Sequence, residues 1–140
     1  MIIKIDTASA TPIYEQLREK IIYGVASGAL GPGEALPSAR RLAADLGVNL
    51  HTVGKAYATL TDEGIIAMDR RRGAVISKTA PADKDFYDAL NKRIGLTAAE
   101  AICRGVGYEE FAAICAKSYR VNGRVNNSAE KGDKNANERA

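Results

Sequence analysis

Twelve residues in three short clusters have the chemistry of nucleic-acid contacts. Hydroxyl, amide, imidazole and guanidinium groups donate hydrogen bonds to phosphate oxygens and to the acceptors on base edges, and an apolar side chain can contact a thymine methyl group. The net charge of the chain is only +3, so any basic patch must come from local clustering. The candidate DNA-binding residues are Ser38, Arg40 and Arg41; Asn49, Leu50, His51, Thr52 and Lys55; and Arg70, Arg71, Arg72 and Gly73.

The sequence gives little support to catalytic or metal-dependent chemistry. His51 is the single histidine among 140 residues, and a protein metal site normally needs three or four ligands. We find no nucleophile–base pair and no glycine loop of the kind that cradles phosphate. The two cysteines, Cys103 and Cys115, lack metal-ligand or redox spacing, and we expect both to be small, buried, reduced residues on helices. We therefore predict that the chain is not an enzyme and has no cofactor.

The first two clusters lie at the starts of two helices joined by a short turn. Ser38 is a good N-cap for a helix that ends at Leu46-Gly47, and Asn49 is a good N-cap for the next one. Gly47 stands where a helix C-terminus favours positive φ. The inward face of the third helix is predicted to carry Val53, Ala56, Tyr57 and Leu60, at i, i+3, i+4 and i+7.

A preceding helix and a following hairpin complete the domain. Thr11 as N-cap and Pro12 as first residue predict a helix that runs to about Ser27. Residues 65–69 and 74–78 are short and rich in β-branched residues, so we expect a hairpin with the arginines at its tip. Ala35-Leu36 is expected to form a very short strand that pairs with this hairpin. The layout is that of a winged helix-turn-helix, over residues 1–79.

Residues 80–121 are predicted to form a separate helical region. The pattern allows either one kinked helix over about 83–104 or two helices, the second capped by Thr97 and Glu100. A last helix is expected over Tyr108–Tyr119. Because neither segment hides its apolar face alone, we predict dimerisation there, with an effector pocket among the same residues as the less favoured alternative. The dimerisation residues are Phe86, Leu90, Ile94, Phe111 and Ile114.

The C-terminal residues and the hydropathy of the chain predict a disordered tail and a cytoplasmic location. Residues 122–140 are rich in Asn, Gly, Ser and Lys and contain one large apolar residue, so we expect a disordered tail. No secretory leader opens the chain and no apolar run approaches membrane-spanning length. We therefore predict a cytoplasmic protein without a membrane partner.

Many of these residues together resemble the DNA-binding domain of GntR-type bacterial transcription regulators. The opening Pro-Ile-Tyr-Glu-Gln and the short helical C-terminal region resemble the YtrA subfamily. The resemblance covers about residues 11–78. It rests on Pro12–Leu17, Gly28–Gly33, Leu36–Ala43, Leu46–Asn49, Thr52-Val53, Lys55–Tyr57, Leu60 and Glu63-Gly64.

The resemblance implies a homodimer that binds a pseudo-palindromic operator on double-stranded DNA, and we expect a repressor. By position, it implies that the starts of the second and third helices and the hairpin tip contact DNA. Arg41 stands where family members often have an acidic residue, which removes a possible capping-box acceptor and places a second cation at a helix N-terminus. Leu50-His51 replaces a Pro-Asn that is common in the subfamily, so the base preference is expected to differ. The alternatives are a winged-helix module that binds protein and an architectural DNA binder without a promoter.

Overall fold

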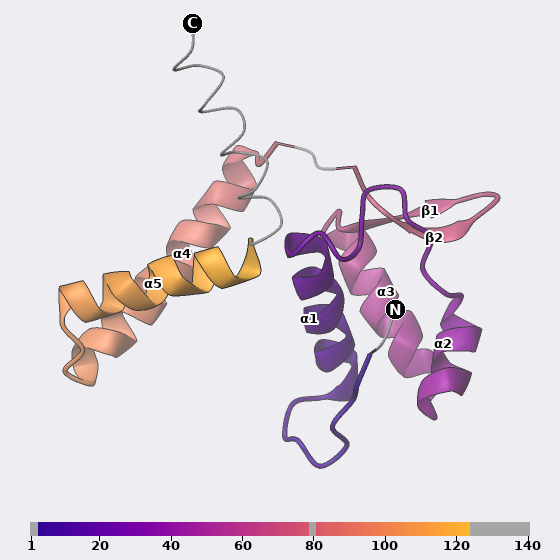
Figure 1. Ribbon diagram of the computed structural model, residues 1–140, viewed down its shortest axis with the longest axis horizontal. Helices are drawn as coiled ribbons and strands as arrows, with labels where there is room; N and C mark the ends of the chain where they lie inside the picture. The colour runs from indigo at the N-terminus through magenta and orange to yellow at the C-terminus, as the bar shows by residue number, and fades with distance from the viewer. Residues whose placement is uncertain (1–2, 79–80, 124–140) are drawn as a thin grey trace, which may run out of the picture. The chain divides into compact units, whose positions relative to one another are not determined.

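The computed structural model describes residues 3–78 and 81–123. The chain divides into two compact units, Met1–Lys78 and Thr79–Ala140. Figure 1 shows the first unit as three helices with a two-stranded hairpin, and the second as two helices. Apart from Asn122 and Gly123, the predicted disordered tail lies outside the described residues. No helix in the described part of the chain has the length and hydropathy needed to cross a membrane.

Helix α1 (Ile13–Ala26) begins one residue later than predicted. Pro12, not Thr11, is the N-cap, with ψ at 146°, and no side chain caps the helix. The Pro12 carbonyl accepts the amides of Glu15 and Gln16, so the prediction of Thr11 as N-cap was wrong. The Thr11 carbonyl instead accepts a hydrogen bond from Gln16 Nε2 at 2.8 Å. The same Gln16 amide bonds Asp6, which ties the N-terminal segment to α1.

The core of the first unit lies between α1, α2 (Ala39–Leu46) and α3 (Leu50–Asp62). Leu17 and Ile21 of α1 are fully buried, as their helical spacing requires. The predicted inward face of α3 is confirmed, because Val53, Ala56, Tyr57 and Leu60 are all buried. An ion pair connects α1 to the C-terminal end of α3, where Arg18 donates two hydrogen bonds of 2.7 and 2.9 Å to Glu63.

Strands β1 (Ile66–Asp69) and β2 (Gly73–Ile76) form the expected antiparallel hairpin. Asp69 pairs with Gly73 next to the turn, and Ile66 pairs with Ile76 at the open end. Ala35 forms the predicted bridge to the hairpin, opposite Val75. Burial of Ile66, Ala74 and Ile76 attaches the hairpin to the helical core.

In the second unit, α4 (Lys84–Cys103) is one continuous helix that passes through Gly95. The alternative of a new helix capped by Thr97 is wrong, because the Thr97 hydroxyl donates to the Arg93 carbonyl one turn earlier. Asp83 is the N-cap of α4 and accepts the amide of Phe86 at 2.8 Å. After a turn that includes Gly105 at φ 77°, the chain continues as α5 (Tyr108–Asn122).

Neither helix of the second unit contains a buried residue. Cys103 and Cys115 are exposed, so the prediction of buried cysteines was wrong. The physical reason is that two helices alone cannot enclose a side chain on all sides. Large apolar side chains are exposed as well, among them Phe86, Ile94 and Ile114, at about half of their surface. Leu90 and Phe111 are partly buried.

Candidate nucleic-acid interface

The start of α2 presents a capping hydroxyl and an arginine to solvent. Ser38 Oγ accepts the backbone amide of Arg41 at 3.2 Å, as its predicted role as N-cap requires. The hydroxyl proton is not used in that bond, so it remains a donor for a phosphate oxygen. Arg40 is exposed next to this cap. The backbone amides of a helix N-terminus add a favourable field for an anion at the same place.

The turn between α2 and α3 has the geometry that its glycine predicts. Gly47 has φ 66° and ends α2, while the Val48 amide donates to the Ala43 carbonyl at 3.0 Å. Asn49 Oδ1 accepts the amide of His51 at 2.8 Å and so caps α3. The carboxamide NH₂ of Asn49 is left as a donor on the solvent side. The helix therefore begins with an oriented polar group, at a fixed point after α2.

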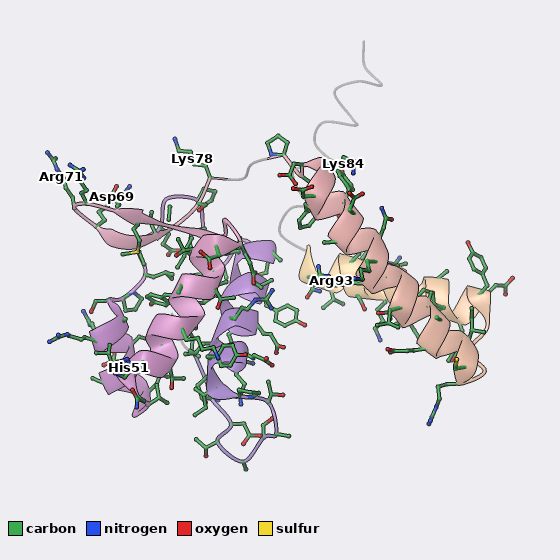
Figure 2. The ribbon with its side chains drawn as sticks, turned by 180° about the vertical axis from the view of Figure 1, so that it is seen from behind. His51, Asp69, Arg71, Lys78, Lys84 and Arg93 are labelled. Atoms are coloured by element: carbon green, nitrogen blue, oxygen red, sulfur yellow. The ribbon has the colours of Figure 1, made fainter. Side chains whose placement is uncertain are left out.

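The first turn of α3 displays the residues that the sequence singled out. His51 is exposed and lies at the outer end of the helix (Figure 2). Leu50 has 40% of its surface exposed, which leaves its side chain available for an apolar contact. Thr52 is partly buried behind them.

Lys55 lies further along α3 and its ammonium group already has a partner. Its Nζ is 3.9 Å from the centroid of the Tyr14 ring in α1, a cation–π contact. Such a contact stabilises by about 0.5–1 kcal/mol at an exposed site. The helical spacing correctly gave an exposed position, but it could not show that α1 offers an aromatic ring there. DNA contact by Lys55 would compete with this interaction.

A hydrogen bond joins the middle of α3 to the chain just before α2. The Tyr57 hydroxyl in α3 donates to the Pro37 carbonyl at 2.7 Å, immediately before the α2 N-cap. Tyr57 has only 7% of its surface exposed, and its burial raises the pKa of the phenol to about 12. The sequence identified Tyr57 as core but gave no signal for this bond.

The hairpin tip is organised by Asp69, a residue that the sequence analysis overlooked. Asp69 Oδ1 accepts the backbone amides of Arg71 at 2.8 Å and Arg72 at 3.0 Å. These two hydrogen bonds lower the pKa of the Asp69 carboxyl, and the charge of Arg72 lowers it further. Aspartate favours turns because its side chain can accept a hydrogen bond from the backbone amide two residues later. The sequence therefore did contain a signal for the role of Asp69. Gly73 has φ 74°, which a residue with a side chain rarely adopts.

The three arginines at the tip are not equivalent. Arg72 Nη1 donates to the Gly33 carbonyl at 2.9 Å, and its Nη2 lies 3.5 Å from Asp69 Oδ2. Arg71 points away from the body of the hairpin (Figure 2). Within the part of the chain that the structure describes, neither Arg70 nor Arg71 forms a side-chain ion pair. All three arginines are exposed, and Arg70 and Arg71 are the two whose charge has no ion-pair partner among the described residues.

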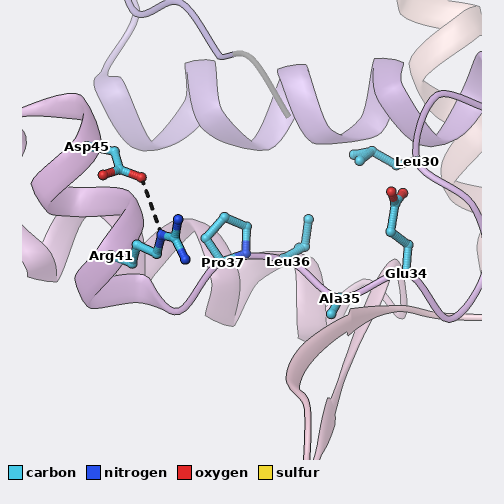
Figure 3. A pocket seen from close by; sticks show the side chains of 7 residues that line it. All are labelled: Leu30, Glu34, Ala35, Leu36, Pro37, Arg41 and Asp45. Atoms are coloured by element: carbon cyan, nitrogen blue, oxygen red, sulfur yellow. Dashed lines mark ion pairs between the residues drawn. The ribbon is translucent and has the colours of Figure 1, made fainter.

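Arg41 lies beside an open groove between α2 and the loop before it (Figure 3). Its Nε is 3.8 Å from Asp45 Oδ2, one turn along the helix, and both side chains are largely exposed. A cation near a helix N-terminus is unfavourable by about 0.3–1 kcal/mol, and Asp45 offsets part of this. The groove has a volume of about 430 Å³. Its lining residues are Leu30, Glu34, Ala35, Leu36, Pro37, Arg41 and Asp45.

This arrangement defines a class of protein. Two capped helices at a glycine turn, the second with an exposed N-terminal face, followed by a basic-tipped hairpin, constitute a winged helix-turn-helix. Comparison with known proteins then identifies the family. Residues 10–76 match the family described as bacterial regulatory proteins, gntR family. The chain belongs to the GntR family and is a YtrA-like helix-turn-helix transcription regulator.

Two related proteins support this assignment over more than half of the chain. A transcriptional regulator of Mycobacterium tuberculosis, Rv1152, is 37% identical over 97 residues, which are 69% of this chain and 80% of that protein. The transcriptional repressor YtrA of Bacillus subtilis is 46% identical over 78 residues, 56% of this chain and 60% of the repressor. Each is named as a regulator of transcription, not as an enzyme.

Solved structures show the same fold. YtrA from Sulfolobus acidocaldarius, a GntR-family transcription factor, is 43% identical with a TM-score of 0.60, over 71% of this chain and 99% of that one. A transcriptional antiterminator from Listeria monocytogenes EGD-e is 28% identical with a TM-score of 0.80. That match covers 88% of this chain and 93% of the other, so it includes much of the C-terminal helical region.

Proposed function

We propose that this protein is a homodimeric repressor that binds a pseudo-palindromic operator through α3. The observation that carries the proposal is the pair of capped helix starts, at Ser38 and Asn49, in two helices that the Tyr57–Pro37 hydrogen bond ties together. In helix-turn-helix proteins the first of these helices contacts the DNA backbone and the second reads the bases. Repression is inferred from the likeness to the repressor YtrA of Bacillus subtilis.

The residues take distinct roles in this proposal. Ser38 and Arg40 bind phosphate at the start of α2, and Asn49 and Thr52 bind phosphate at the start of α3. His51 donates to a base acceptor in the major groove, and Leu50 contacts a thymine methyl group. The hairpin tip binds the DNA backbone beside the recognition helix. Two subunits would place two such helices about 34–36 Å apart, one turn of DNA.

The homodimer is proposed to form through the apolar faces of α4 and α5. Phe86, Ile94 and Ile114 expose about half of their surface, and no residue of either helix is buried. Monomeric proteins rarely expose contiguous apolar patches of this kind. A second copy of the same helical region would cover them, since self-complementary two-fold interfaces are the commonest in soluble oligomers.

Gel-shift titration with Arg40→Ala tests the DNA contacts, and Lys20→Ala is the matched control. Both substitutions remove one positive charge from an exposed helix position, but Lys20 lies on α1, outside the proposed interface. We expect Arg40→Ala to weaken binding to a cognate operator about tenfold or more and Lys20→Ala to leave it nearly unchanged. Replacement of Arg70, Arg71 and Arg72 by Ala should weaken binding to all DNA sequences. Unchanged affinity of both the Arg40 and the triple variant would refute the assignment of the site.

The same titration distinguishes a DNA-binding protein from a winged helix that binds another protein. DNA affinity should fall steeply between about 50 and 200 mM salt if phosphate contacts dominate. An architectural DNA binder would share that salt dependence but would protect DNA without a preferred sequence. A footprint confined to one palindrome supports the repressor, whereas absence of retention on DNA at low salt contradicts it.

A further inference from the structure

We propose that Asp69 and Arg72 form a clamp that positions the wing, and that Arg71 rather than Arg72 is its DNA-directed cation. This inference rests on the proposed DNA binding and refines it. The sequence alone makes Arg70, Arg71 and Arg72 equal candidates. The structure separates Arg72 from the other two, because its side chain contacts Gly33 and Asp69 whereas Arg70 and Arg71 form no side-chain ion pair among the described residues.

The clamp has a backbone part and a side-chain part. The carboxylate of Asp69 holds the turn by accepting the amides of Arg71 and Arg72, at 2.8 and 3.0 Å. Its second oxygen faces the Arg72 guanidinium at 3.5 Å. A single carboxylate therefore sets both the backbone of the turn and the direction of one arginine, while Arg71 contributes only its backbone.

Arg72 connects the hairpin to a segment that is distant in sequence. Its Nη1 donates to the carbonyl of Gly33, in the loop that leads into α2. The same loop bonds β2 through three backbone hydrogen bonds of 2.8 Å: Gly33 N to Ile76 O, Ile76 N to Glu34 O, and Leu36 N to Ala74 O. Through Arg72, the tip of the wing is tied to Gly33, in the loop that leads to Ser38. The wing and the start of α2 are thus held in one arrangement.

Engagement of Arg72 makes it a poor phosphate ligand. Two of its guanidinium nitrogens already face acceptors, and one of these acceptors is the negatively charged carboxylate of Asp69. Contact with phosphate would require breaking the Gly33 bond. Arg71, by contrast, projects from the tip without an ion-pair partner among the described residues. A long, uncompensated cation at a hairpin tip has the chemistry to bind a DNA phosphate.

The charge-neutral double variant Asp69→Ala/Arg72→Ala separates positioning from charge. It removes one negative and one positive group, so the net charge of the wing is unchanged. Simple electrostatics predicts the wild-type affinity for operator DNA, and it predicts tighter binding for Asp69→Ala alone. If the clamp positions the wing, its loss should instead weaken binding in both variants. We expect both variants to bind about threefold to tenfold more weakly, because the turn loses its hydrogen-bonding carboxylate.

The salt dependence of binding assigns the phosphate contact. Arg71→Ala should reduce the slope of log affinity against log salt by about one, whereas Arg72→Ala should weaken binding and leave the slope nearly unchanged. The proposal is overturned if the double variant binds like wild type. It is also overturned if Arg72→Ala, and not Arg71→Ala, lowers the slope.

Amide hydrogen exchange of the free protein tests the clamp without DNA. Arg72→Ala should accelerate exchange at Gly33 and Leu36, whose amides bond β2, and Arg71→Ala should not. Equal exchange in both variants contradicts the clamp. If the wild-type protein fails to select any DNA, the proposed function fails, but the exchange result still decides whether Asp69 and Arg72 hold the wing.

Discussion

Tyr57 in the recognition helix donates a 2.7 Å hydrogen bond to the carbonyl of Pro37, just before the N-cap of α2. One phenol thus belongs both to the core and to the site. Its ring is packed among the buried side chains of the first unit, and its hydroxyl sets where α2 begins. Because Ser38 and Arg40 follow directly, a core residue determines where the proposed phosphate contacts lie.

Tyr57→Phe should destabilise the protein and weaken DNA binding together. The substitution keeps the ring and removes the hydroxyl, which leaves the Pro37 carbonyl without this partner. We expect the free energy of unfolding to fall by about 0.5–1.5 kcal/mol, measured by urea denaturation. Operator affinity should fall as well, even though Tyr57 is buried. A variant with unchanged stability and unchanged affinity would show that the bond positions nothing.

The same residue predicts a loss of stability at alkaline pH. Burial raises the pKa of Tyr57 from 10.0 to about 12, so the unfolded chain loses this proton more readily than the folded one. The stabilisation is complete below about pH 10 and is lost as pH rises toward about 12. Denaturation of wild type and Tyr57→Phe across this range should show a smaller difference in stability at the upper end. A constant difference would contradict the assignment.

Gly54 and Gly47 should respond in opposite ways to alanine. A Cβ added at Gly54, inside α3, meets no atom within 4 Å, and the residue has helical φ. We expect Gly54→Ala to raise the free energy of unfolding by about 0.5–1 kcal/mol. Gly47 has φ 66°, so Gly47→Ala should lower it by about 1 kcal/mol. Thermal denaturation measures both, and destabilisation by Gly54→Ala would contradict the open space found there.

Ile94→Glu should disrupt the proposed dimer. The substitution places a charge on the apolar face of α4, where Ile94 exposes 49% of its surface. We expect the dimer dissociation constant to rise at least tenfold, because burying an unpaired charge in an apolar interface is unfavourable. Sedimentation equilibrium measures it. Lys92→Gln, an exposed position two residues away, changes the net charge by the same amount and should leave the dimer intact.

If Ile94→Glu sediments like wild type, α4 is not the dimer interface. Retention of the helical content by circular dichroism would show that the variant still folds. The exposed thiols offer a second measurement on the same region, since Cys103 and Cys115 lie on these helices. A dimer that covers either of them should slow its alkylation relative to the Ile94→Glu variant.

Local signals in the sequence were sufficient for the elements of the first unit. Ser38, Gly47 and Asn49 act within a few residues of the chain, and each has the predicted geometry. The stripe from Val53 to Leu60 is buried because a helix of that period has only one face toward the core. The N-cap of α1 was placed one residue early because a threonine before a proline favours a hydroxyl cap, whereas in the structure no side chain caps α1 and the Thr11 carbonyl accepts a hydrogen bond from Gln16.

The interactions that distinguish one site residue from another were not visible in the sequence. Lys55 finds Tyr14 on another helix, and Arg72 finds the Gly33 carbonyl 39 residues away. No periodicity encodes such contacts, because they depend on how the elements pack. Asp69 is different, since an aspartate before a turn is a local signal that was present and overlooked. The prediction of buried cysteines was wrong because helical spacing does not show how many other helices pack against a given helix.

Selection of bound DNA from random duplexes tests the central claim most directly. The protein is incubated with the pool, and retained DNA is amplified and sequenced over several rounds. We expect enrichment of one pseudo-palindrome, with half-sites whose centres are about one helical turn apart. Absence of enrichment, or enrichment without two-fold symmetry, would contradict a homodimer that reads its operator through the starts of α2 and α3.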